Sequence, residues 1–356
     1  NTVFGLDYHI ALAIGAVVIL VYTLLGGFSA VCDTDSIQGS VMFIGIVVVP
    51  IMALAMTGNL SDALTANLGE AGSTFMNPMY DGGSKISGIS IISQLGWGLG
   101  YCGMPHILVR FMAVKSDKEL NKAKVIGIIW VAISLFFACV IGVVGRIFLT
   151  EDLVASGAQE NVFMLMIIKM FTEHINIPLI GGIFLCGILA AIMSTADSQL
   201  LVTASSVTED FYQGFLGKKL DDKKAVWMSR IVVLVVAAIA FVIAWDPNSS
   251  IMALVSDAWA GLGSAFGPAV LMSLYWKRTN RQGAAAGIAV GALTVIFWDY
   301  LPLFGGETAA TVTGLYSLVI GFALSLIAIV IVSLVTPAPD KEITDEFDRV
   351  NAKKAA

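Results

Sequence analysis

The stretch AAIMSTADSQLL, residues 190–201, places three hydroxyls, a carboxylate and an amide inside the otherwise apolar run 178–206. Such a run is long enough to cross a bilayer as a helix, which takes about 20 mostly apolar residues. The whole chain has the same character, since 57% of its 356 residues are hydrophobic, 13% are charged and the mean hydropathy is +0.86. The sequence therefore predicts an all-α polytopic membrane protein.

Nine apolar segments are predicted to span the membrane as helices. They cover residues 8–31, 37–57, 88–113, 124–149, 178–206, 226–245, 251–276, 284–302 and 312–335. The shorter apolar segment 161–171 is expected to lie at the membrane interface or to cover a vestibule. We expect one transmembrane domain over residues 1–335, followed by a tail over residues 336–356.

The basic residues indicate the orientation of these spans. Seventeen of the 20 Lys and Arg residues lie in alternate loops or in the C-terminal tail. By the positive-inside rule, those loops and the C-terminus are cytoplasmic, in a multi-pass protein of the cell membrane. Nine spans then place Asn1 outside, so we expect an odd number of further spans to precede it in a longer protein.

Composition and residue spacing exclude several functional classes. A net charge of −6 disfavours a nucleic-acid partner. The three histidines are isolated, and the four cysteines lie in or at the ends of apolar spans with no zinc or disulfide spacing. Because no nucleophile, base and orienting group occur together, we do not expect an enzyme.

The polar residues of the opening stretch share one side of a helix. Ala191, Ser194, Thr195 and Ser198 lie at i, i+3, i+4 and i+7, with Asp197 at the edge of that face. Hydroxyl, carbonyl and carboxylate oxygens suit hard cations, so an alkali cation is the expected guest. The alternative is that these hydroxyls bond back to their own helix and help helices to pack.

A second acid, Asp35, lies in VCDTDSIQ, residues 31–38, the expected break between the first two spans. This break has no basic residue, unlike the other cytoplasmic loops. One interpretation is that Asp35 is an intramembrane acid on an ion path; the alternative is that Asp33 or Asp35 caps the second helix. A capping acid can also line an ion path, so the two roles are compatible.

The third span contains GWGLGYCGMP, residues 96–105, with four glycines and a proline. Gly and Pro disfavour a helix interior by about 1 and 3 kcal/mol relative to Ala, which predicts an interrupted helix. Its exposed backbone groups would face a cavity or ligand, beside an aromatic wall of Trp97 and Tyr101. The alternative is close helix packing through Gly96 and Gly100.

Four blocks of the sequence resemble the sodium/solute symporter family, and most closely its sodium/proline symporters. They are YTLLGGFSAVCDTDSIQ (22–38), GWGLGYCGMPHILVRFMA (96–113), ILAAIMSTADSQLLVTASSVTED (188–210) and LVSDAWAGLGSAFGPAVLMSLYW (254–276). The resemblance implies a LeuT-type inverted-repeat transporter fold. On that pattern the nine spans correspond to core helices four to ten and two additional helices, and the first core helices lie outside this chain.

The resemblance also implies site residues. The main sodium site would use the Ala191 carbonyl with Ser194 and Thr195, its other half coming from the first core helix. A second sodium site would use Ser194 together with Asp35, Asp197 and Ser198.

Trp97, Tyr101 and Pro105, with Gly100 at the interruption, would line the substrate side. Asp33, Asp257 and Met104 depart from the proline-symporter pattern; these departures bear on the substrate and not on the fold.

The function expected from this resemblance is sodium-coupled symport of a small amino acid, L-proline, by alternating access. The partners would be sodium, the small substrate and the lipid bilayer. Two alternatives remain open: symport of another small carboxylate, a sugar or a vitamin, or a symporter-like domain of a membrane sensor.

Overall fold

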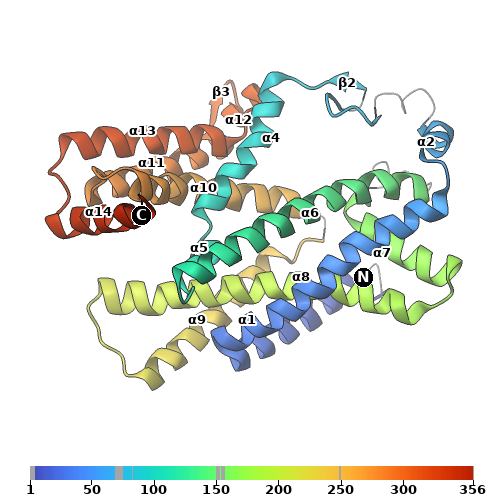
Figure 1. The fold of residues 1–356 in the computed structure, drawn as a ribbon, viewed down its shortest axis with the longest axis horizontal. Helices are drawn as coiled ribbons and strands as arrows, with labels where there is room; N and C mark the ends of the chain where they lie inside the picture. Colours follow the sequence, from blue (N-terminus) through green and yellow to red (C-terminus); the bar gives the residue numbers. More distant parts are fainter. Residues whose placement is uncertain are drawn as a thin grey trace. The chain divides into compact units, whose positions relative to one another are not determined.

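A computed structural model describes residues 5–68, 75–81, 83–149, 153, 157–247 and 250–355 (Figure 1). In these residues the chain is almost entirely helical, with two short antiparallel hairpins. It forms two compact units. Unit 1 comprises Asn1–Pro78 and Val114–Pro247, and unit 2 comprises Met79–Ala113 and Asn248–Ala356.

Unit 1 is built from long helices and short helical turns. These are α1 (Tyr8–Thr57), α2 (Leu60–Leu68), α6 (Asp117–Leu149), η3 (Gln159–Asn161), α7 (Val162–Ile168), the π-helical turn η4 (Lys169–His174), α8 (Pro178–Ser205), the π-helical segment η5 (Ser206–Phe215) and α9 (Asp222–Ile243). Helix α1 packs chiefly on α8 and α6. The segment expected at the membrane interface forms α7 and η4, and its Met166, Ile167, Met170 and Phe171 are buried in the core of this unit.

Helix α1 contains both of the first two predicted spans. The hydroxyls of Tyr22 and Thr34 are in contact. In a straight helix the Cα atoms of two residues 12 positions apart would lie about 18 Å apart along the axis, too far for these side chains to meet. The helix must therefore bend sharply between them. Two parts of its described residues, Tyr8–Gly26 and Val31–Thr57, are long and apolar enough to cross a membrane. The alternative in which Asp33 or Asp35 caps a helix is wrong, because both lie inside α1, whose N-cap is Asp7.

Unit 2 is built around a bundle of three helices, α10, α11 and α13. Its elements are β1 (Tyr80–Asp81), β2 (Ser84–Lys85), α4 (Gly88–Gly100), the 3₁₀ turn η2 (Tyr101–Gly103), α5 (Pro105–Met112), α10 (Ile251–Tyr275), α11 (Arg281–Tyr300), β3 (Pro302–Phe304), β4 (Glu307–Thr308), α12 (Ala309–Thr313), α13 (Ser317–Val335) and α14 (Lys341–Ala355). Helices α11 and α13 lie side by side, and α10 packs on both (Figure 1).

Glycines allow this bundle to pack closely. Gly283, Gly287 and Gly291 follow one another at intervals of four residues on α11 and are buried. A Cβ at Gly287 would collide with Ile329 of α13, and one at Gly291 with the backbone of Ser264 in α10. Small residues at this spacing let helix backbones approach each other, as is common in membrane proteins.

The predicted interruption of the third span is confirmed. Helix α4 ends at Gly100, the turn η2 follows, and Met104 is extended with φ −79° and ψ 113°. Pro105 then occupies the first turn of α5, where its missing N–H costs nothing. At Gly103 a Cβ would lie 2.8 Å from the Cα of Gly263 in α10, so a larger residue would displace the break from its neighbour.

Among the described residues, seven helical segments are long and apolar enough to cross a membrane. They are Tyr8–Gly26, Val31–Thr57, Asp117–Leu149, Pro178–Phe215, Asp222–Ile243, Arg281–Tyr300 and Ser317–Val335. The other two predicted spans are the interrupted segment, whose α4 and α5 have 13 and 8 residues, and α10, which has 25 residues but is rich in Gly, Ser and Ala.

Candidate functional site

The hydroxyl face of α8 is present as the sequence predicts. The hydroxyls of Ser194 and Thr195 both donate to the carbonyl of Ala191, each at 3.1 Å. Ser198 donates to the carbonyl of Ser194 at 2.7 Å. These bonds match the back-bonding alternative, yet they also gather three oxygen atoms around Ala191 and leave the hydroxyl lone pairs available to a cation.

Two carboxylates meet beside this face, and we call Asp35, Asp197 and Ser198 the acidic cluster. Asp197 is 0% exposed and Ser198 is 7% exposed. The Ser198 hydroxyl lies 3.4 Å from Asp35 Oδ2 and 3.4 Å from Asp197 Oδ1, so one hydroxyl lies between an acid of α1 and an acid of α8. Two carboxylates this close repel each other unless a proton or a cation lies between them.

The sequence did not identify two neighbours of the acidic cluster. The bend in α1 brings the hydroxyls of Tyr22 and Thr34 together, and the Tyr22 hydroxyl also interacts with Asp197. Thr34 donates to the carbonyl of Val31 at 3.0 Å. In the sequence, the signal for this contact is that Tyr22, a polar side chain, lies in the apolar run that precedes Asp35.

In unit 2 an aromatic cluster surrounds the interrupted helix; its members are Trp97, Tyr101, Trp259 and Tyr316. Trp97 stacks on Tyr316 with ring centroids 5.3 Å apart, and Tyr101 meets Trp259 edge to face at 4.9 Å. The predicted aromatic wall of Trp97 and Tyr101 is thus joined by rings from α10 and from the residue before α13. Tyr101 remains 46% exposed.

Trp259 connects this cluster to the break. Its indole N–H donates to the carbonyl of Trp97 at 3.0 Å, in the last turn of α4, where carbonyls lack a normal helical partner. A Cβ at Gly100 would collide with the same indole, and one at Gly96 with Val319. Gly96 and Gly100 therefore allow close packing, as the alternative predicts, and the helix is also interrupted after Gly100.

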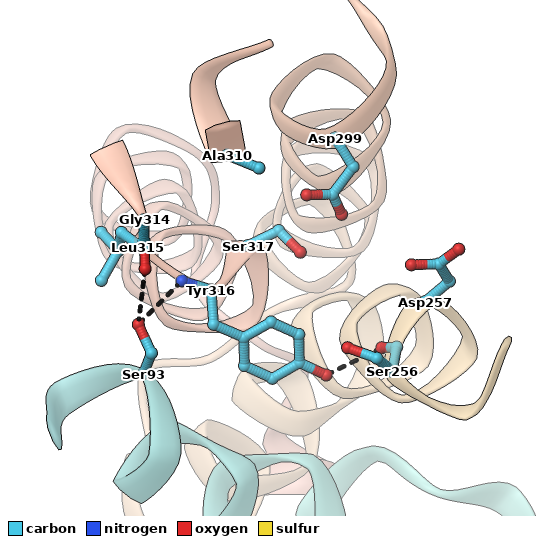
Figure 2. A pocket seen from close by; sticks show the side chains of 9 residues that line it. All are labelled: Ser93, Ser256, Asp257, Asp299, Ala310, Gly314, Leu315, Tyr316 and Ser317. Atoms are coloured by element: carbon cyan, nitrogen blue, oxygen red, sulfur yellow. Dashed lines mark hydrogen bonds between the residues drawn. The ribbon is translucent and has the colours of Figure 1, made fainter. Parts of the chain in front are cut away.

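A cavity of about 230 Å³ lies next to the aromatic cluster (Figure 2). Its lining residues come from α4, α10, α11, α12, the turn before α13 and the first residue of α13: Ser93, Ser256, Asp257, Asp299, Ala310, Gly314, Leu315, Tyr316 and Ser317. Tyr316 donates to the carbonyl of Ser256 at 2.7 Å, and the N–H of Tyr316 donates to Ser93 at 3.0 Å. Tyr316 thus belongs to both the cavity and the aromatic cluster.

Comparison with known proteins identifies related sequences over nearly the whole chain. The model of the sodium:solute symporter family matches residues 1–291. The osmoregulated proline transporter OpuE of Bacillus subtilis is 45% identical over 341 residues, which are 96% of this chain and 66% of that protein.

Two further relatives agree with this match. The high-affinity proline transporter PutP of Bacillus subtilis is 41% identical, over 98% of this chain and 70% of the relative. The sodium/proline symporter of Staphylococcus aureus is 42% identical, over 98% and 67%. The chain therefore spans about two thirds of the length of these relatives, all of which are transporters.

A solved structure shares the fold. The substrate-bound outward-open state of a Na⁺-coupled sialic acid symporter matches with a TM-score of 0.68 at 19% sequence identity, over 96% of this chain and 69% of that one. At this identity the likeness concerns the fold alone. It confirms the LeuT-type, all-α membrane fold predicted from the sequence.

Proposed function

Because this chain belongs to the sodium:solute symporter family, we propose that it forms the greater part of a sodium-coupled symporter whose substrate is L-proline. The three relatives described above, all named as proline transporters or sodium/proline symporters, support this substrate. We further propose that both units belong to one transporter domain over residues 1–335, in the cell membrane, with the tail 336–356 in the cytoplasm.

The observation that carries the proposal is the group of oxygen atoms on α8. The Ala191 carbonyl already lies 3.1 Å from the hydroxyls of both Ser194 and Thr195, so a cation at their side would find three hard ligands. Thr195 is exposed in this structure, which leaves room for an ion and further ligands. Neutral ligands suit a transported ion, because a site that bound it too tightly would not release it inside the cell.

The acidic cluster supports a second sodium site. Asp35 and Asp197 lie on either side of the Ser198 hydroxyl, and a bound cation would offset the repulsion of the two carboxylates. An acid buried at membrane depth is costly, by about 2.5 to 3.5 kcal/mol on insertion scales, and such residues commonly mark ion pathways. Ser194 would contribute to this site through its carbonyl, which Ser198 contacts.

The interrupted helix supports a substrate site on the side of unit 2. Trp97 and Tyr101 provide aromatic surface with polar edges, and the break from Gly100 to Pro105 leaves backbone groups outside regular helical bonding. A small zwitterion such as proline has a charged amine and a charged carboxylate, which can be recognised by such carbonyl and N–H groups. Interrupted helices near the midplane are the usual substrate sites of secondary transporters.

Coupling follows from linked binding. If sodium and substrate favour the same outward-facing state, each must raise the affinity of the other by the same factor. The inward sodium gradient then drives uptake, and the membrane potential adds about 2.3 kcal/mol per charge per 100 mV.

The direct test is uptake of labelled proline by the whole transporter in liposomes with an imposed sodium gradient. Replacing sodium by choline should abolish accumulation. Uptake that is indifferent to this replacement would contradict sodium coupling. Competition of unlabelled carboxylates, sugars and vitamins with labelled proline tests the substrate, and displacement by one of them at lower concentration than proline would reassign it.

A further inference from the structure

The cavity of unit 2 contains polar groups that the proposed symport does not use. Asp257 of α10, Asp299 of α11 and Ser317 at the start of α13 surround one open space above the Tyr316 ring (Figure 2). None of the nine lining residues is basic. The lining is therefore acidic and rich in oxygen atoms.

The bonding of the Ser317 hydroxyl favours a ligand in this space. Ser317 is 1% exposed, and its hydroxyl forms no hydrogen bond of ordinary geometry with any residue that the structure describes. The hydroxyl points into the open space beside Asp299, with whose carboxylate it also interacts (Figure 2). A buried hydroxyl without a normal partner costs about 1 to 3 kcal/mol unless a ligand or water completes its bonding.

Several polar groups around the cavity are already hydrogen-bonded within the protein. Tyr300 donates to Asp257 at 2.7 Å, and Trp298 donates to the Leu315 carbonyl at 3.0 Å. Ser93 donates to the carbonyl of Gly314 at 3.3 Å. These bonds fix the wall and leave the Asp299 carboxylate, the second oxygen of Asp257 and the Ser317 hydroxyl facing the open space.

We propose that this cavity binds a divalent cation of the calcium type through Asp257, Asp299 and Ser317. Two carboxylates balance two positive charges, and Ca²⁺ takes six to eight oxygen ligands in flexible geometry. A cavity of about 230 Å³ leaves room for several waters, each of which occupies about 30 Å³ in the liquid. An amino-acid zwitterion fits less well, because its carboxylate would face two acids and no basic group.

The affinity of such a site is modest. With two protein carboxylates and water as the other ligands, the dissociation constant belongs to the weak range, on the order of 1 mM. In the orientation proposed above, this end of α11 and α13 faces the outside of the cell. Bound cation would join α10, α11 and α13 at that end and hold Tyr316 against Trp97.

The test is terbium luminescence of the purified chain in detergent. Tb³⁺ substitutes for Ca²⁺, and excitation of Tyr316 and Tyr300 should sensitise its emission. We expect Ca²⁺ at about 1 mM to halve this emission, whereas Na⁺ at equal ionic strength should leave most of it. Asp257→Asn and Asp299→Asn should each weaken Ca²⁺ competition about 10-fold, and Ser317→Ala about 3-fold.

Asp62→Asn is the matched control, because Asp62 is an exposed acid of α2 outside the cavity. A calcium-sensitive signal that survives in both Asp257→Asn and Asp299→Asn would overturn the proposal, as would equal displacement by Na⁺. If an Asn variant does not fold, Ser317→Ala decides, since unchanged Ca²⁺ competition in that variant would also overturn it. The outcome is independent of proline uptake, so it does not depend on the proposed symport.

Discussion

The acidic cluster of unit 1 and the aromatic cluster of unit 2 provide polar groups at membrane depth in different ways. In unit 1 the polar atoms are side chains on helices whose backbone bonding continues through the site, as Asp197 and Ser198 do on α8. In unit 2 the helix itself stops between Gly100 and Pro105, and the break leaves backbone groups for other partners.

This difference fits the two kinds of ligand proposed above, a sodium ion and a small zwitterion. A small cation needs a few oxygen atoms held at fixed positions, which an intact helix provides with side chains one turn apart. A zwitterionic substrate needs donors and acceptors on both sides, which an interrupted helix supplies from its backbone together with aromatic surface. Each substitution below changes the polar or aromatic groups of one unit and leaves those of the other unit as an internal reference.

The largest effect is expected from Asp197→Asn. The substitution removes a fully buried charge from the acidic cluster while keeping the size of the side chain. We expect the sodium concentration for half-maximal proline uptake to rise about 100-fold, which corresponds to about 2.7 kcal/mol. Asp33→Asn, an exposed acid of α1, should change it less than 2-fold, and an equal effect of both would remove the acidic cluster from the ion path.

The next effect is expected from Gly100→Ala. The new methyl group would collide with the Trp259 indole and displace the aromatic cluster. Proline affinity should fall about 10- to 30-fold, because overpacking typically costs 1 to 3 kcal/mol, whereas the sodium requirement at saturating proline should change little. Gly98→Ala is the matched control in the same helix, since nothing lies within 4 Å of its Cβ position; a similar loss there would implicate helix propensity instead of the collision.

A smaller effect is expected from Ser194→Ala and Thr195→Ala. Each removes one neutral ligand of the proposed main sodium site, so the sodium requirement should rise about 3- to 10-fold while the thermal midpoint shifts little. Thr203→Ala provides the control, because Thr203 bonds back to the Gln199 carbonyl of the same helix at 2.8 Å. If all three variants kept the wild-type sodium dependence, the hydroxyls of Ser194 and Thr195 would have a packing role only.

The smallest effect is expected from Trp259→Phe. Phenylalanine keeps most of the ring but loses the indole N–H, so the Trp97 carbonyl in the last turn of α4 loses its donor. We expect the free energy of unfolding to fall by about 1 kcal/mol, as measured by thermal or denaturant unfolding in detergent. Trp227→Phe, at a side chain of α9 that is 63% exposed, should change stability by less than about 0.5 kcal/mol, and equal losses would argue against a role of the indole bond.

Most of the helices and the features within one helix could be predicted from the sequence. The interruption at residues 96–105 and the oxygen face of α8 depend on residues within ten positions of each other, and helix geometry fixes their arrangement. The sequence also predicts a break near residues 31–38, close to the bend of α1, but helical bonding continues through Asp33 and Asp35, so neither residue caps a helix.

The members added to each cluster could not be predicted in this way. Trp259 lies 162 residues from the Trp97 carbonyl that it contacts, and Asp35 lies 163 residues from Ser198. A single sequence does not show which of several apolar helices will pack together, since their lipid-facing and buried surfaces have similar composition.

The sequence by itself determined that this is a helical membrane protein, where its third span breaks and which side chains of α8 share a face, because hydropathy, Gly and Pro content and helical periodicity act locally. Tertiary structure alone decided that Asp35 meets Ser198, that Trp259 and Tyr316 complete the aromatic cluster, and that Asp257, Asp299 and Ser317 surround one cavity. These groupings depend on how glycine-lined helices fit against one another, and that fit involves residues far apart in the chain.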